Sequence, residues 1–173
     1  MEIFLEVNCL FRLKKSSCFL IICFIYLTNN VKLITMNPTI KNILAVVVGW
    51  FGGSIINMGL VQAGNSIYPI EGIDPNDMEA LAAVMPTLAN EHFIFPFLAH
   101  ALGTLVGAMI AYLIAATHKM KFALAIGVLF LLGGIAVNYM LPGPTWFAVA
   151  DIALAYIPMA FLGAKLAQTF SKK

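Results

Sequence analysis

Residues 93–116 read FIFPFLAHALGTLVGAMIAYLIAA, a stretch without Asp, Glu, Lys or Arg. An α-helix needs about 20 predominantly apolar residues to cross the hydrocarbon core of a bilayer. Other stretches of this chain meet the same requirement, so the sequence predicts an all-α membrane protein built as a four-transmembrane-helix bundle. The remaining predicted spans are residues 43–63, 122–141 and 145–167.

The composition supports the same class of protein. The chain has 173 residues, of which 61% are hydrophobic and 10% are charged, whereas about 25% of the residues in an average soluble domain are charged. The net charge of +2 is small, and the basic residues adjoin apolar stretches instead of forming a stripe, so no nucleic-acid partner is expected. The expected partner is the lipid bilayer, with a homo-oligomer or a larger membrane complex left open.

Residues 1–35 are predicted to be an N-terminal extension outside the bundle. Residues 12–27 combine a basic and a short apolar segment, as a signal sequence does, but no small-x-small cleavage site follows them. The apolar part is too short to span a bilayer. Either the segment is an uncleaved, signal-like anchor, or translation starts at Met36; the loop charges favour the second interpretation, which leaves residues 36–173 as the membrane domain.

The charges of the loops predict the direction of the helices. Residues 64–91 contain five carboxylates and no Lys or Arg. Basic loops remain in the cytoplasm, so the sequence predicts that both termini are cytoplasmic and that residues 64–91 form an outer loop. The basic residues that adjoin the other span ends are Lys41, His118, Lys119, Lys121, Lys165, Lys172 and Lys173.

The outer loop contains a helix signal of its own. Asp74 is a suitable N-cap, and Pro75 suits the first helical position. Met78, Leu81 and Met85 then follow the spacing of one helical face. We expect a short amphipathic helix on the outer membrane surface, which either covers the bundle or acts as a lid over a cavity.

Four polar side chains, one from each predicted span, lie in the outer half of the bundle. At 1.5 Å per helical residue, His100 lies about 12 Å from the outer end of its span, Asp151 and Asn57 about 9 Å, and Asn138 about 5 Å. Ionisable residues in membrane spans usually face the bundle interior and are paired. We therefore expect His100 to pair with Asp151 in an outward-facing polar pocket, with the two asparagines and Thr104 beside them.

The rim of this pocket is predicted to contain Glu91 and His92. Glu91 follows Asn90, a suitable helix cap, and its charge would stabilise the start of the helix. His92 and His100 lie about 12 Å apart along one helix, which is too far to share a metal ion. The sequence also lacks the common zinc-protease, hydrolase and nucleotide-binding motifs, so it predicts no metal, no cofactor and no catalytic residue.

Small residues recur at four-residue spacing, as in Gly49-x-x-x-Gly53 and Gly103-x-x-x-Gly107. Such spacing lets the backbones of two membrane helices approach closely, so we expect a tight bundle. Pro158 falls within the last span and is expected to kink it.

Two longer stretches carry a family resemblance. They are HFIFPFLAHALGTLVGAMIAYLIAATHKMKFALAIGV, residues 92–128, and LPGPTWFAVADIALAYIPMAFLGAKLA, residues 141–167. They resemble a group of small, uncharacterised four-helix membrane proteins of bacteria. This resemblance covers residues 36–173 and implies a bacterial inner-membrane location, but it implies no activity. The chain is also similar in size to small multidrug-resistance transporters, but residues 43–63 lack their membrane glutamate.

Three function classes remain open, of which the sequence favours the first. A structural or accessory membrane subunit would need the polar cluster only for stability. A protein that binds or translocates a proton, an ion or a small solute would use the pocket at His100 and Asp151. A membrane enzyme would use His100 as a general base, but would also need a nucleophile or cofactor that the sequence does not reveal.

Overall fold

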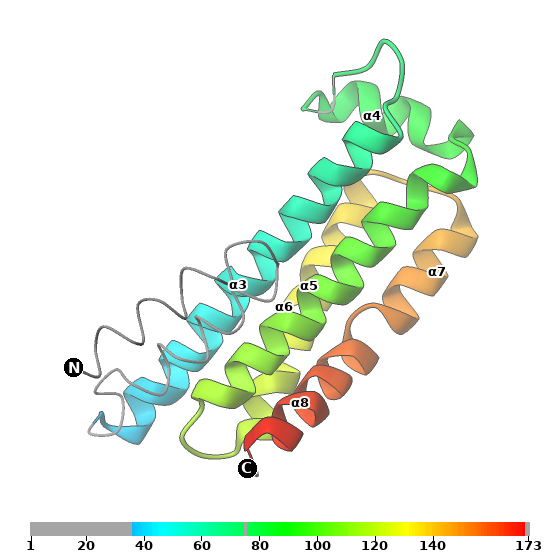
Figure 1. Ribbon diagram of the computed structural model, residues 1–173. Helices are drawn as coiled ribbons and strands as arrows, with labels where there is room; N and C mark the ends of the chain where they lie inside the picture. Colours follow the sequence, from blue (N-terminus) through cyan, green and yellow to red (C-terminus); the bar gives the residue numbers. More distant parts are fainter. Residues whose placement is uncertain (1–35, 75, 172–173) are drawn as a thin grey trace, which may run out of the picture. The chain divides into compact units, whose positions relative to one another are not determined.

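The computed structural model describes residues 36–74 and 76–171 (Figure 1). The chain divides into two units, Met1–Asn37 and Pro38–Lys173. Only the second unit is described below, so the predictions for residues 1–35 and for Pro75 lie outside the described residues.

The described part of the chain is helical and contains no strand. It has four helices that are long and apolar enough to cross a membrane, and each overlaps one predicted span. This confirms the all-α, four-span prediction and is compatible with an integral membrane protein. The spans are α3 (Pro38–Ile67), η3 (Asn90–Phe93) continued by α5 (Ile94–Ile114), α6 (Lys119–Met140), and α7 (Thr145–Leu154) followed by α8 (Ile157–Ser171).

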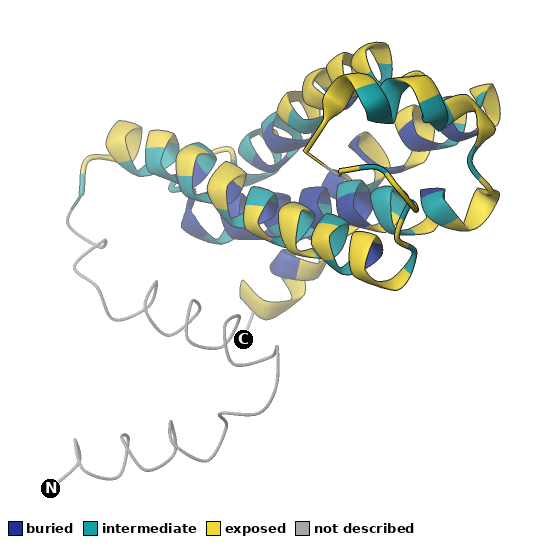
Figure 2. Cartoon of the chain, turned by 90° about the horizontal axis from the view of Figure 1, so that it is seen from above, coloured by how far each residue is buried: buried dark blue, intermediate teal, exposed yellow. Residues whose placement is uncertain are grey.

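Helix α5 is the central element of the bundle. It packs against α3, α6 and α8, and 56% of its most apolar stretch is buried, compared with 17% for α3. Figure 2 shows buried residues on the facing sides of the helices and exposed residues on their outer sides. The exposed sides of these spans are apolar, as expected of surfaces that face lipid.

Glycines set the close approach of α3 and α5. A Cβ atom added at Gly49 would lie 2.7 Å from the carbonyl oxygen of Gly107, and one added at Gly53 would lie 2.6 Å from that of Gly103. Both distances are shorter than a carbon atom tolerates, so only glycine permits this packing. The two small-residue patterns seen in the sequence therefore pack against each other.

The fourth span is interrupted where α7 ends and α8 begins. Pro158 lies near the start of α8, and because proline has no N–H it cannot continue the hydrogen-bond ladder of α7. The regular helix is broken at Ala155 and Tyr156, as the kink predicted at Pro158 requires. Both of these residues are buried, with Tyr156 only 1% exposed.

The connection from α3 to η3 contains the short helix α4 (Met78–Val84), followed by η2 (Met85–Thr87). Figure 1 shows α4 near the end of α3. The helix begins one turn later than the sequence suggested, because its N-cap is Asp77, whose side chain accepts the N–H groups of Glu79 and Ala80. Asp74 instead accepts the backbone N–H of Asn76 within the preceding turn.

Candidate functional site

His100 and Asp151 are the centre of the candidate site. Asp151 of α7 is completely buried, and one of its oxygens, Oδ1, lies 2.8 Å from Nδ1 of His100 on α5. The side chain of His100 is 14% exposed. The structure thus brings together the two ionisable residues that the sequence placed at similar depth, and it buries the carboxylate more completely than the imidazole.

Tyr156 is a third member of the cluster. Its hydroxyl group donates a hydrogen bond to Oδ2 of Asp151 at 2.8 Å, and the hydroxyl oxygen of Tyr156 lies 3.0 Å from Nδ1 of His100. The sequence analysis missed this residue, since five positions along a continuous helix would turn Tyr156 away from Asp151. The break before α8 removes that restriction, and Pro158 was the one sequence signal that could have revealed it.

Asn138 of α6 supplies a further donor. Its Nδ2 atom lies 3.3 Å from Oδ2 of Asp151 and 3.0 Å from the backbone oxygen of Gly134. The carboxylate of Asp151 therefore receives donors from three side chains carried by α5, α6 and the α7–α8 break. Such saturation is what allows a carboxylate to be buried, because an unpaired buried charge is very costly.

The hydrogen bonds favour one tautomer of His100. Tyr156 has a single hydroxyl hydrogen, which it donates to Asp151. An ionised Asp151 can only accept, so Nδ1 supplies the hydrogen of its contact with that carboxylate, and in a neutral imidazole Nε2 is then an acceptor. Both hydrogen-bond contacts of His100 with the described residues are made by Nδ1.

An outer cavity of about 260 Å³ adjoins His100. Side chains of α3, α4, α5, α6 and α7 line it, and most of them are apolar. Its polar lining includes His92, His100 and Asn138. Its apolar lining includes Val61, Met78, Leu81, Met85, Leu88, Phe93, Phe95, Leu141 and Phe147.

A second cavity, of about 290 Å³, lies between α3 and α6 and is also lined by His100. Asn57, Trp50 and Tyr156 contribute to its walls. Asn57 therefore lies near the cluster, as its depth suggested, but among the described residues it makes no hydrogen bond with His100 or Asp151. His100 and Val137 line both cavities.

The remaining predicted residues have different positions. Thr104 is completely buried one turn along α5 from His100, and its hydroxyl has no partner among the described residues; it lines neither cavity. His92 lines the outer cavity, whereas Glu91 is exposed and does not line it. The predicted cap at Asn90 is wrong, because η3 begins at that residue with Ala89 as its N-cap.

Within residues 36–74 and 76–171, no group of three or more His, Cys, Asp or Glu side chains could hold a metal ion. The arrangement at His100 instead suits hydrogen bonding, because Asp151 fixes its Nδ1 atom and the residue lines both cavities. No protein-family model, curated protein or solved structure matches this chain.

Proposed function

We propose that this chain is an integral membrane protein that binds a small apolar molecule in the outer cavity, through a head group that donates a hydrogen bond to His100. The observation that carries the proposal is that His100, whose Nδ1 atom is hydrogen-bonded to Asp151, lines a mostly apolar cavity. Binding sites for small molecules are typically apolar, with a few fixed polar groups that orient the ligand. Asp151 and Tyr156 fix the imidazole in the orientation that such a site requires.

The charges near the cavity favour a head group that carries an N–H or O–H donor. The carboxylate of Asp151 lies 2.8 Å from Nδ1 of His100. The segment from residue 64 to 91 has five carboxylates and no Lys or Arg. These charges repel an anion, whereas an alcohol or amine can donate to Nε2. We therefore propose an aliphatic alcohol or amine as the ligand class.

Helix α4 would act as the lid of this cavity. Met78 and Leu81 of α4, together with Met85 of η2, line the cavity from the loop side. Methionine is flexible and adapts to ligands of different shape. None of the residues of α4 is fully buried, so its displacement would cost less than that of any bundle helix.

Photolabelling in lipid nanodiscs tests this proposal with a diazirine-bearing analogue of decanol. We expect the probe to label peptides of α4 and η2, and unlabelled decanol to compete better than decanoate. His100→Gln should abolish the competed labelling, whereas His118→Gln, the same substitution outside this cavity, should preserve it. Equal competition by decanoate, or unchanged labelling of His100→Gln, would exclude the proposed head-group contact.

A structural or accessory subunit is the second candidate function. Asp151 is completely buried and receives three donors, which favours this function. Such a network could hold α5, α6 and α7 together without binding any ligand. In that case His100→Gln would lower stability, no probe would label the outer cavity specifically, and the protein would purify as a homo-oligomer or with membrane partners.

The proposed location is a bacterial inner membrane with both termini in the cytoplasm. The separation of acidic and basic loops supports this orientation. Residues 36–173 contain no cysteine, so single cysteines can report the topology in a background that lacks the three natural ones. In intact cells a membrane-impermeant maleimide should label Glu71→Cys but not Thr169→Cys, and the reverse pattern would refute the orientation.

A further inference from the structure

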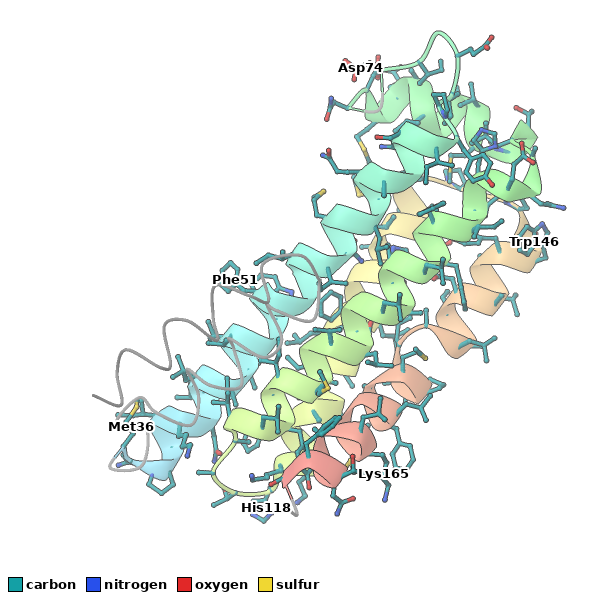
Figure 3. The ribbon with its side chains drawn as sticks, viewed as in Figure 1. Met36, Phe51, Asp74, His118, Trp146 and Lys165 are labelled. Carbon is teal, nitrogen blue, oxygen red and sulfur yellow. The ribbon has the colours of Figure 1, made fainter. Side chains whose placement is uncertain are left out.

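A basic cavity lies at the end of the bundle away from α4. Its volume is about 400 Å³, and it is formed by the end of α5, the start of α6 and the last part of α8. Figure 3 shows His118 and Lys165 at this end of the bundle, and Asp74 and Trp146 at the other. The residues that line the cavity are Tyr112, His118, Lys119, Met120, Lys121, Lys165 and Gln168.

The lysines of this cavity have no carboxylate partner among the described residues. The described carboxylates belong to α7 or to the connection between α3 and α5. The Nζ atom of Lys119 instead lies 5.6 Å from the centre of the Tyr112 ring, and that of Lys165 lies 5.3 Å from the centre of the Phe161 ring. The positive charge of Lys119, Lys121 and Lys165 is therefore available to an anion.

Tyr112 adds a possible hydrogen-bond donor to the lysines that line the cavity. The residue is only 9% exposed and its ring belongs to the apolar core, but its hydroxyl is not among the buried polar atoms that lack a partner. Because Tyr112 also lines the basic cavity, an acceptor bound there could take its hydrogen bond.

We infer that this cavity binds the head-group phosphate of an anionic phospholipid. The phosphate would accept the Tyr112 hydroxyl hydrogen and be neutralised by Lys119, Lys121 and Lys165. Basic pockets between the ends of membrane helices are suited to such head groups. The apolar helices α5 and α6 meet at the cavity, so a lipid can place its phosphate there while its acyl chains remain against the bundle.

Native mass spectrometry tests the inference on the full chain, released from nanodiscs that contain equal amounts of phosphatidylglycerol and phosphatidylcholine. We expect preferential retention of phosphatidylglycerol by the wild type. Lys119→Gln and Lys165→Gln should each reduce that retention roughly fivefold, the effect of one basic residue near an anionic lipid. Tyr112→Phe should also reduce it, although this variant keeps every positive charge.

Lys41→Gln is the matched control. Lys41 precedes Asn42, which hydrogen-bonds Thr117 beside the same end of the bundle, but Lys41 does not line the cavity. Its substitution should leave the retention of phosphatidylglycerol unchanged. An equal loss in Lys41→Gln, or equal retention of the two lipids by the wild type, would overturn the site. Displacement of the lipid by an equal concentration of inorganic phosphate would overturn the assignment to a lipid.

Discussion

Replacing Tyr156 by phenylalanine tests whether the buried cluster stabilises the bundle. The substitution removes one hydroxyl and leaves the aromatic ring, which is 1% exposed. That hydroxyl donates to Oδ2 of Asp151 at 2.8 Å, where the other donor, Asn138, lies 3.3 Å away. A hydrogen bond to a charged group contributes about 1.5–3 kcal/mol, so we expect the free energy of unfolding to fall by about 2 kcal/mol.

The assay is equilibrium unfolding of the full chain in mixed micelles by titration with sodium dodecyl sulfate. Tyr139→Phe is the matched control, because Tyr139 lies on α6 and is 88% exposed; its effect should stay within about 0.5 kcal/mol. In an Asp151→Asn background the loss caused by Tyr156→Phe should shrink, since a neutral acceptor forms a hydrogen bond about half as strong. Equal stability of the Tyr156→Phe and Tyr139→Phe variants would refute the reasoning, as would an undiminished loss in the Asp151→Asn background.

Three further predictions concern the packing and the ends of the helices, and the same unfolding assay measures all of them. Gly107→Ala should lower the free energy of unfolding by about 1–3 kcal/mol, because its Cβ would lie 2.7 Å from the carbonyl oxygen of Gly49; Gly59→Ala, which has nothing within 4 Å, should cause no loss. His118 has a left-handed φ of 44°, so His118→Gly should raise the free energy of unfolding by up to about 1 kcal/mol, and a loss would contradict the backbone argument. Asn42→Ala should cost about 1–3 kcal/mol, because its Oδ1 accepts the backbone N–H groups of two residues that follow α5; an unchanged free energy would show that those N–H groups find water instead.

Much of the fold could be predicted from apolar length alone. A membrane span must satisfy its own backbone hydrogen bonds, so a sufficiently long apolar stretch has few alternatives to a helix. The ends of the helices were harder to predict. Helix α3 runs from Pro38 to Ile67, beyond the predicted 43–63, because a helix can continue into polar residues that no longer lie in hydrocarbon. Asp77 caps α4 in place of Asp74 because both residues are suitable caps and only the local backbone decides between them.

The candidate site could be predicted only in part, for a geometric reason. The rise per residue gives the depth of a side chain, and depth correctly brought His100 close to Asp151. Depth does not give the rotation of a helix about its axis, which directs Asn57 into the second cavity and buries Thr104 away from both cavities. Tyr156 was beyond such reasoning, because its direction depends on the break between α7 and α8.

The proton positions of His100 provide the most direct test of the proposed ligand site. The measurement is the ¹⁵N NMR spectrum of the imidazole in lipid nanodiscs, before and after the addition of decanol, with His100→Gln to assign the signals. We expect a proton on Nδ1, none on Nε2 in the neutral ring, and a shift of the Nε2 signal when decanol donates its hydrogen bond. A ring with the proton on Nε2 and an unprotonated Nδ1 would contradict the proposed site. A spectrum that decanol leaves unchanged would contradict it as well.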